Sequence, residues 1–166
     1  MDEPIGFRSF VEQRERQLLR LAWSLTGSRQ QGEDLAQAAL VRLWQRWYRL
    51  MPGVDPWPYL RRITVSLYLT DRRRRWHGEI PHDQLPDRAD DDRMADSDNQ
   101  QLIGRWLAGL GPRQRTVVVL RYLADLTVEE TAEAMDCAPG TVKSQAARAL
   151  ATLRGVATAD TIGEDS

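Results

Sequence analysis

The side chains best suited to reading a DNA sequence lie between residues 127 and 154. Two short helices joined by a tight turn are predicted there, with Lys143, Ser144 and Gln145 near the start of the second helix. A helix-turn-helix motif places its second helix in the major groove, where such side chains meet base edges. Arg148 and Arg154 add positive charge along the same helix. The segment also fits a plain helical hairpin with a solvated basic face.

Local signals define the two predicted helices. Thr127 and Glu130 have the spacing of a capping box, which indicates a helix start. Residues 136–140 are predicted to end that helix, because Pro139 lacks a backbone N–H and disfavours helical geometry at the residue before it. The second helix is predicted to begin at Gly140 or Thr141. Its predicted buried stripe consists of Val142, Ala146, Leu150 and Leu153.

Composition favours an all-α protein, and the length allows one domain or two small ones. The chain has 166 residues, 42% of them hydrophobic, and its apolar residues mostly recur at helical spacing. Apolar runs are too short to span a membrane, and the first ten residues do not resemble a signal peptide. The single cysteine, Cys137, excludes an internal disulfide and fits a cytoplasmic location. We interpret it as a small buried residue, a redox role being the alternative.

The charge distribution divides the chain into three parts. Residues 1–76 carry 14 basic and 8 acidic side chains, whereas residues 77–100 carry 2 basic and 8 acidic ones. Such an acidic segment, poor in large apolar residues, is typical of a flexible linker. It would separate a helical domain at 5–76 from a second one at 101–155, and the tail at 156–166 is predicted to be disordered.

The first domain is predicted to contain three helices and the second to begin with two more. Gly27 should end the first helix, Ser28 should cap the next at about 30–50 with Gln31 as partner, and Asp55 should cap a third from Pro56 to about Trp76. The predicted buried residues of the third helix are Trp57, Leu60, Ile63 and Leu67, with Leu69 as a further candidate. In the second domain, Gly111-Pro112 should separate a helix at 102–110 from one that runs through Tyr122.

Other candidate sites are less specific. The acidic and amide groups of 33–37 fit ordinary compensation of a helix dipole. The run Arg72–Arg75 fits either a solvated helix end or a surface for phosphates and bases. His77 and His82 lie in the acidic segment and do not suggest a metal site. No catalytic motif or cofactor-binding motif stands out, so the sequence does not indicate an enzyme.

The order of these segments resembles a known family. GEDLAQ in the first domain is followed by the basic segment RRITVSLYLTDRRRR, an acidic linker and then LGPRQRTVVVLRYLADLTVEETAEAMDCAPGTVKSQAARAL. This arrangement is similar to the extracytoplasmic-function (group IV) sigma factors of bacterial RNA polymerase, particularly those of actinobacteria. The resemblance implies a factor that binds core polymerase, directs transcription from promoters and helps to open the DNA.

The resemblance also implies roles for individual residues. The helix that docks on the clamp helices of the largest polymerase subunit matches Asp34, Leu35, Gln37, Leu40 and Trp44. The part that captures the promoter −10 element and a flipped base matches Arg61, Arg62, Ser66, Arg72, Arg73, Arg74 and Arg75. The reader of the −35 element matches Arg121, Thr141, Lys143, Ser144, Gln145 and Arg148. Ser66 stands where the family often has Asn, and Gln145 where it often has Arg.

The implied partners are core RNA polymerase, through its clamp helices and flap, promoter DNA and an anti-sigma protein, with no membrane insertion. Two alternatives stay open on the sequence. One is a stand-alone helix-turn-helix regulator with an N-terminal partner-binding domain, and the other is a helical adaptor that does not bind DNA. A stand-alone regulator needs neither the face of Asp34 and Gln37 nor the basic helix that follows it.

Overall fold

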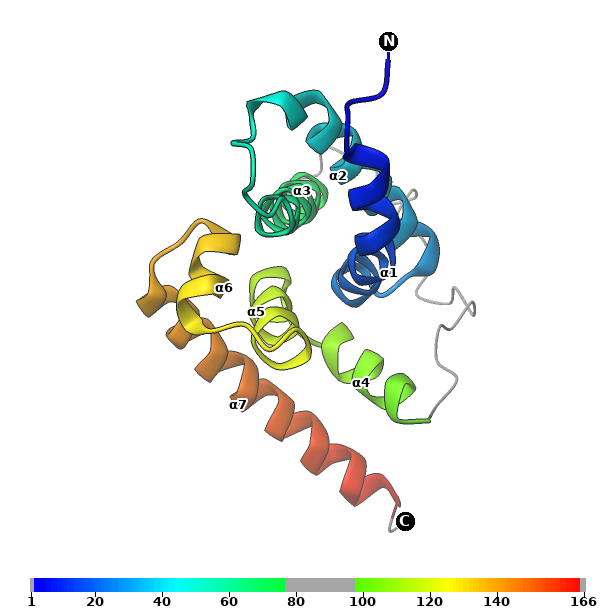
Figure 1. Cartoon of the computed structure of the whole chain (residues 1–166). Coiled ribbons are helices and arrows are strands. Elements are labelled where there is room, and N and C mark those ends of the chain that lie inside the picture. Colours follow the sequence, from blue (N-terminus) through cyan, green and yellow to red (C-terminus); the bar gives the residue numbers. More distant parts are fainter. Residues whose placement is uncertain (1, 77–97, 165–166) are drawn as a thin grey trace. The chain divides into compact units, whose positions relative to one another are not determined.

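The chain forms two compact helical units (Figure 1). The computed structural model describes residues 2–76 and 98–164, and every regular element in those ranges is a helix. The units span Met1–Asp92 and Arg93–Ser166. The predicted all-α class with two small helical domains is confirmed. The predicted acidic linker at 77–100 lies outside the described residues except at its end, where a helix begins.

Within residues 2–76, the first unit contains three long helices and one short turn of 3₁₀ helix. Its elements are α1 (Phe7–Thr26), α2 (Arg29–Arg46), η1 (Trp47–Arg49) and α3 (Trp57–Trp76). Gly27 ends α1 as predicted, because its φ of 73° lies in the left-handed region that glycine adopts without steric cost. Ser28 then caps α2 by accepting a hydrogen bond from the Gln31 backbone N–H, at 3.3 Å.

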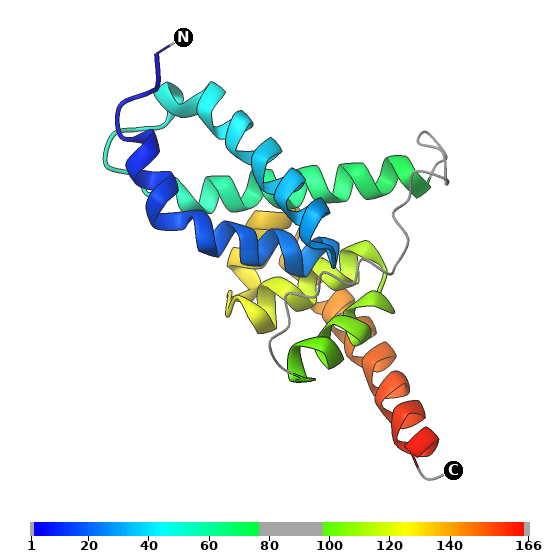
Figure 2. The same ribbon diagram turned by 90° about the vertical axis from the view of Figure 1, so that its right-hand side faces the viewer.

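The core of the first unit lies where α1, α2 and α3 meet. Figure 2 shows α1 and α2, in two shades of blue, running side by side against the green α3. The buried apolar cluster consists of Phe10, Leu18, Ala22, Ala36, Ala39, Leu43, Trp57 and Leu60. Alanines on the inner face of α2 let the helices approach closely. The approach is tightest at Gly32, because a Cβ there would lie 2.1 Å from Cδ1 of Trp23 on α1.

The buried face of α3 differs from the predicted one. Trp57 and Leu60 are buried as expected, but Ile63 and Leu67 are only partly buried at the edge of the core. The positions that complete the buried face are Thr64, Val65 and Tyr68. Thr64 satisfies its hydroxyl by donating to the Leu60 backbone oxygen at 2.8 Å. A polar residue can therefore occupy the core side of this helix without an unmade hydrogen bond.

The second unit is built on the helix-turn-helix segment. It comprises α4 (Asp98–Ala108), α5 (Pro112–Val118), η3 (Val119–Leu123), α6 (Val128–Met135) and α7 (Pro139–Glu164). Helices α5 and α6 each pack against α7, and η3 contacts both α5 and α6. The helix predicted to run through Tyr122 instead changes to a π-helical turn at Val119. The Ala124 N–H accordingly bonds the Val119 oxygen, five residues back.

Helix α7 is longer than the sequence predicted at both ends. It begins at Pro139 rather than at Gly140 or Thr141, and it continues to Glu164 where a disordered tail was predicted from 156. Proline suits the first helical position, because its missing N–H would have no partner there. At the other end no proline follows, and Gly155 alone does not stop the helix: the Thr158 hydroxyl donates to the Arg154 oxygen across it.

Candidate nucleic-acid interface and protein-docking face

The turn between α6 and α7 is held by defined caps at each side. The Glu130 N–H donates to the Thr127 hydroxyl at 3.0 Å, and the Thr127 N–H donates to the Glu130 carboxylate at 3.2 Å. The predicted capping box is therefore confirmed. At the far end of α6, Asp136 adopts φ 52° and the Cys137 N–H bonds the Ala132 oxygen. These bonds fix the direction in which α7 leaves the turn.

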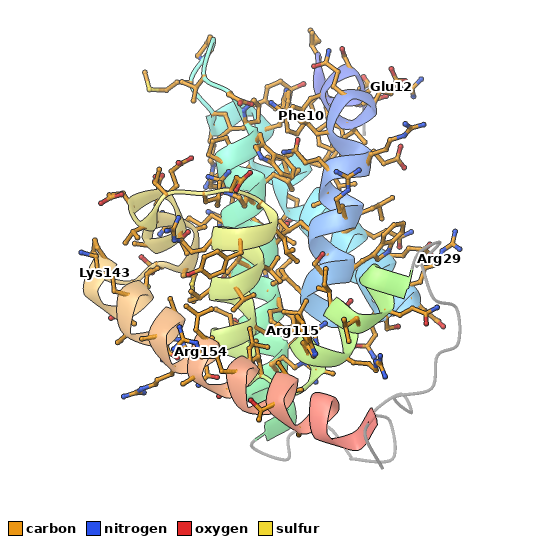
Figure 3. All side chains as sticks on the ribbon, turned by 90° about the horizontal axis from the view of Figure 1, so that it is seen from below. Phe10, Glu12, Arg29, Arg115, Lys143 and Arg154 are labelled. Atoms are coloured by element: carbon orange, nitrogen blue, oxygen red, sulfur yellow. The ribbon has the colours of Figure 1, made fainter. Side chains whose placement is uncertain are left out.

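Helix α7 buries one side and presents its polar residues on the other. Val142 and Ala149 are fully buried, whereas Lys143, Ser144 and Arg148 are exposed. Ser144 and Arg148 are four residues apart and therefore lie on the same face, one turn from each other. Figure 3 shows Lys143 near the start of α7 with its side chain directed outward. These exposed donors and acceptors have the arrangement that a recognition helix needs in a major groove.

The other predicted residues of this surface are less accessible. Thr141 and Gln145 are half-buried, beside the packed side of α7. Arg121 is also half-buried, and its guanidinium donates to the Leu126 backbone oxygen and lies over the Tyr122 ring, 5.7 Å from its centroid. Arg121 therefore ties η3 to the segment that precedes α6, which leaves fewer of its donors for DNA.

The predicted DNA-contacting residues of α3 divide between its two sides. Arg62 and Ser66 are exposed and one turn apart. Arg61 is 8% exposed, because it lies on the core side with Thr64 and Tyr68, so its predicted contact with DNA is not supported by this position.

Arg72 and the three arginines that follow it complete the predicted set on α3. Arg72 is half-buried, with its guanidinium 5.8 Å from the centre of the Tyr68 ring. The side chains of Arg73, Arg74 and Arg75 lie outside the described residues, although their backbone continues α3. Arg62 and Ser66 are therefore the predicted contacts that α3 visibly presents.

Asp55 fixes the start of α3. One of its carboxylate oxygens accepts from the Trp57 N–H at 3.0 Å, and the other lies 3.4 Å from the guanidinium of Arg14 on α1. The Arg14 guanidinium also lies over the Trp57 ring, 5.5 Å from its centroid. Asp55 thus caps the helix as predicted, although α3 begins one residue later than expected, at Trp57.

The outer face of α2 brings together four of the five residues predicted to dock on a protein, whereas Leu35, nine positions before Trp44, lies on the other side of the helix. Asp34 and Gln37 are exposed, and Leu35, Leu40 and Trp44 are half-buried. The opposite side of the helix, with Ala36, Ala39 and Leu43, is in the core. The face therefore offers a carboxylate and an amide near its start and apolar side chains nearer its end.

The sequence did not single out an apolar hollow at the end of this face. Phe7, Leu40, Val41 and Trp44 line an open depression between α1 and α2. Val41 is 55% exposed although it is a large apolar residue. The sequence signal that could have indicated this depression is Val41 itself, a β-branched apolar residue on the outer, polar face of the helix. Phe7 lies on another helix, α1, and could not be connected to Val41 without the fold.

Comparison with known proteins supports the same division of the chain. A model described as "Sigma-70 region 2" matches residues 10–78, and one described as "Sigma-70, region 4" matches residues 100–153. The chain is 39% identical to an RNA polymerase sigma-E factor of Streptomyces avermitilis, over 92% of this chain and 85% of that protein. The chain belongs to the sigma-70 family of RNA polymerase sigma factors. It is of the extracytoplasmic-function type and directs promoter-specific initiation of transcription.

A second curated relative resembles this chain in sequence, and a solved structure resembles it in fold. This sigma factor is 38% identical to the sigma-E factor of Streptomyces coelicolor, over 93% of this chain and 87% of that one. A solved sigma factor from Bartonella quintana, in complex with the anti-sigma factor NepR, has the same fold with a TM-score of 0.71, at 23% identity and covering 93% of this chain and 98% of that one. Members of this family are initiation factors, and the polymerase is the enzyme.

Two chemical features of this sigma factor complete the site. Burial raises the pKa of the Cys137 thiol, an effect that Arg113 partly offsets and Asp136 adds to. Cys137 is half-buried rather than fully buried as predicted, and the raised pKa keeps its thiol protonated near neutral pH. Among the described residues, no group of three or more His, Cys, Asp or Glu side chains could hold a metal ion. No helix within 2–76 or 98–164 is long and apolar enough to cross a membrane.

Proposed function

We propose that this sigma factor works through three separate helix faces. The outer face of α2, with Asp34 and Gln37, binds the clamp helices of the largest subunit of core RNA polymerase. Arg62 and Ser66 on α3 contact the −10 element, and Lys143, Ser144 and Arg148 on α7 read the −35 element. The observation that carries the proposal is that these polar side chains are exposed on faces whose opposite sides are packed.

The two units divide the work between them. We assign polymerase binding and the −10 element to a domain at 5–76 and the −35 element to a domain at 101–155. Among the described side chains that we assign to DNA, the exposed cations are Arg62 on α3 and Lys143 and Arg148 on α7, so each surface alone should bind DNA weakly. Polymerase would hold both at the spacing of the two promoter elements, which raises the effective concentration of the second contact once the first has formed. The protein would act where polymerase acts, in the cytoplasm.

Run-off transcription tests this function directly. Purified core polymerase of Streptomyces coelicolor would be supplied with the protein and a promoter library made from genomic DNA. We expect discrete transcripts that depend on the added factor. If no promoter-specific transcript forms with any fragment of the library, the proposed function is wrong.

A paired substitution tests the assignment of α2. Asp34→Ala combined with Gln37→Ala should weaken binding to core polymerase, because it removes the two polar groups that we assign to the contact. Both side chains are exposed, so the hydrophobic core of the first unit should not be affected. Binding of DNA by the second unit should be unchanged. If the double variant binds polymerase as tightly as the wild type, the assignment of α2 is wrong. The function as a sigma factor is not affected by that outcome, because the run-off assay tests it separately.

An inhibitory protein partner is also proposed. The Bartonella quintana neighbour was solved with an anti-sigma factor, and another structure, that of CnrH, was solved with the cytosolic domain of CnrY. The proposal rests on family membership rather than on a surface of this chain. Capture of a protein that releases the factor upon addition of core polymerase would support it, and a factor recovered from cells only in free or polymerase-bound form would contradict it.

A further inference from the structure

The exposed face of α7 carries an apolar residue among its polar ones. Between residues 141 and 149, the exposed side chains of the helix are Lys143, Ser144, Ala147 and Arg148. Ala147 lies four residues after Lys143 and three after Ser144, so it is on the same face, one turn farther along. Its side chain is a single methyl group. The face that we assign to the −35 element therefore presents one apolar group beside three polar ones.

Ala147 lies within this face rather than at its edge. At about 100° of rotation per residue, Lys143 and Arg148 are about 140° apart around the helix axis, and Ala147 and Ser144 lie between them. At Gly140, on the same side of the helix, an added Cβ would meet no atom within 4 Å, so the described part of the second unit leaves the approach open. The short side chains in the middle let the helix come close to a base edge.

The chemistry of an exposed methyl group limits what it can recognise in a major groove. The groove edges of adenine, guanine and cytosine present hydrogen-bond donors and acceptors, and thymine adds its C5 methyl group. An alanine side chain offers no hydrogen bond, so a donor or acceptor that it covers loses its water without gaining a partner. Contact with a thymine methyl instead removes apolar surface from water on both sides. Thymine is therefore the base that Ala147 favours.

We propose that Ala147 is a specificity-determining residue that contacts the C5 methyl group of a thymine in the −35 element. The group recognised is the methyl itself, so the factor distinguishes thymine from uracil and from cytosine at one position. The contact adds apolar selectivity to the hydrogen bonds that Ser144 and Arg148 can make with neighbouring bases. The proposal rests on the proposed function, in which α7 reads the −35 element.

The experiment removes the methyl group from the DNA while the protein stays unchanged. Holoenzyme is assembled from the full-length factor and core polymerase of Streptomyces coelicolor, and its affinity is measured for a promoter that the run-off library yields. Each thymine of the −35 element is replaced in turn by deoxyuridine, which lacks only the C5 methyl group. We expect the affinity to fall about threefold to fivefold at one position, as loss of one methyl contact predicts.

Ala147→Gly removes the methyl group from the protein side of the same contact. With this variant, deoxyuridine at the sensitive position should cause no further loss of affinity, because the contact is already absent. Ala159→Gly is the matched control, since Ala159 is also exposed on α7 but lies about 18 Å farther along the helix. It carries the same lower helix propensity of glycine and should still distinguish thymine from deoxyuridine.

The outcomes separate this proposal from the function on which it rests. If no thymine responds to deoxyuridine, or if Ala147→Gly responds as Ala159→Gly does, the methyl contact is refuted while α7 can still read the −35 element. If Lys143→Ala and Arg148→Ala both leave the dependence on the −35 sequence unchanged, the assignment of α7 is wrong and the proposal fails with it. Should Ala147→Gly lower the unfolding midpoint, Ala147→Ser replaces it, because its hydroxyl disrupts an apolar contact. A folded Ala147→Ser protein that keeps the preference for thymine overturns the proposal.

Discussion

Replacing Gly32 by alanine should destabilise the first unit although alanine is the better helix former. In an exposed helix interior, glycine to alanine gains up to about 1 kcal/mol. At Gly32 the new Cβ would lie 2.1 Å from Cδ1, 3.0 Å from Nε1 and 3.1 Å from Cα of Trp23. Because the last of these atoms belongs to the backbone of α1, rotation of the indole alone cannot relieve the contact. Helices α1 and α2 must separate.

The magnitude follows from two opposing terms. Overpacking a closely packed contact costs typically about 1–3 kcal/mol, and here it should lie in the upper part of that range. Subtracting the propensity gain leaves a net loss of about 1–2 kcal/mol. For a unit of this size, that lowers the unfolding midpoint by roughly 5–15 °C. Trp fluorescence can follow the first unit, because five of the six tryptophans precede residue 93.

Two matched glycines provide the control. At Gly104 in α4 and Gly155 in α7, an added Cβ would meet no atom within 4 Å, so alanine should stabilise their helices. A double-mutant cycle adds a second check: Gly32→Ala should cost less when Trp23 is already alanine. A Gly32→Ala protein as stable as the wild type, or a cost independent of Trp23, would refute the reasoning.

Three further results are expected. Thr127→Ala removes one half of the capping box and should lower the stability of the second unit by about 1 kcal/mol, measured by thermal unfolding; an unchanged midpoint would contradict the cap. Arg148→Ala should weaken binding to a −35 sequence by roughly 1–3 kcal/mol if it reads a base edge, whereas Lys143→Ala should weaken binding to all sequences alike if it contacts phosphate; titrations against matched and scrambled duplexes distinguish the two. Because burial raises the pKa of Cys137, its alkylation by iodoacetamide should increase at a higher pH than that of a free cysteine, and a rate profile shifted to lower pH would oppose this.

Features that depend on a local signal could be predicted from the sequence. The capping box of Thr127 and Glu130 and the left-handed Gly27 were predictable, because each depends on neighbouring residues only. The end of α7 was not, since Gly155 weakens a helix without stopping it.

The side of a helix that faces the core was harder to predict than the helix itself. On α3, the spacing of apolar residues predicted that Ile63 and Leu67 are buried. In the structure the core side of the helix carries Thr64 and Tyr68 instead, and Arg61 is buried on the same side. The hollow on α2 was not predictable, because it depends on Phe7 being brought beside Val41 by the fold. The roles of the site residues in binding remain predictions.

The hydrogen bond that the Trp47 indole N–H donates to the Ile5 backbone oxygen also sets an order of events during synthesis. It joins residues 42 apart in the chain, so it closes a long loop and carries an entropic cost that local helical contacts do not. Helix α1 can form early in a nascent chain, but the N-terminal residues can make this hydrogen bond only after Trp47 has emerged from the ribosome. The residues before α1 therefore gain this contact only after the whole of α2 has been synthesised.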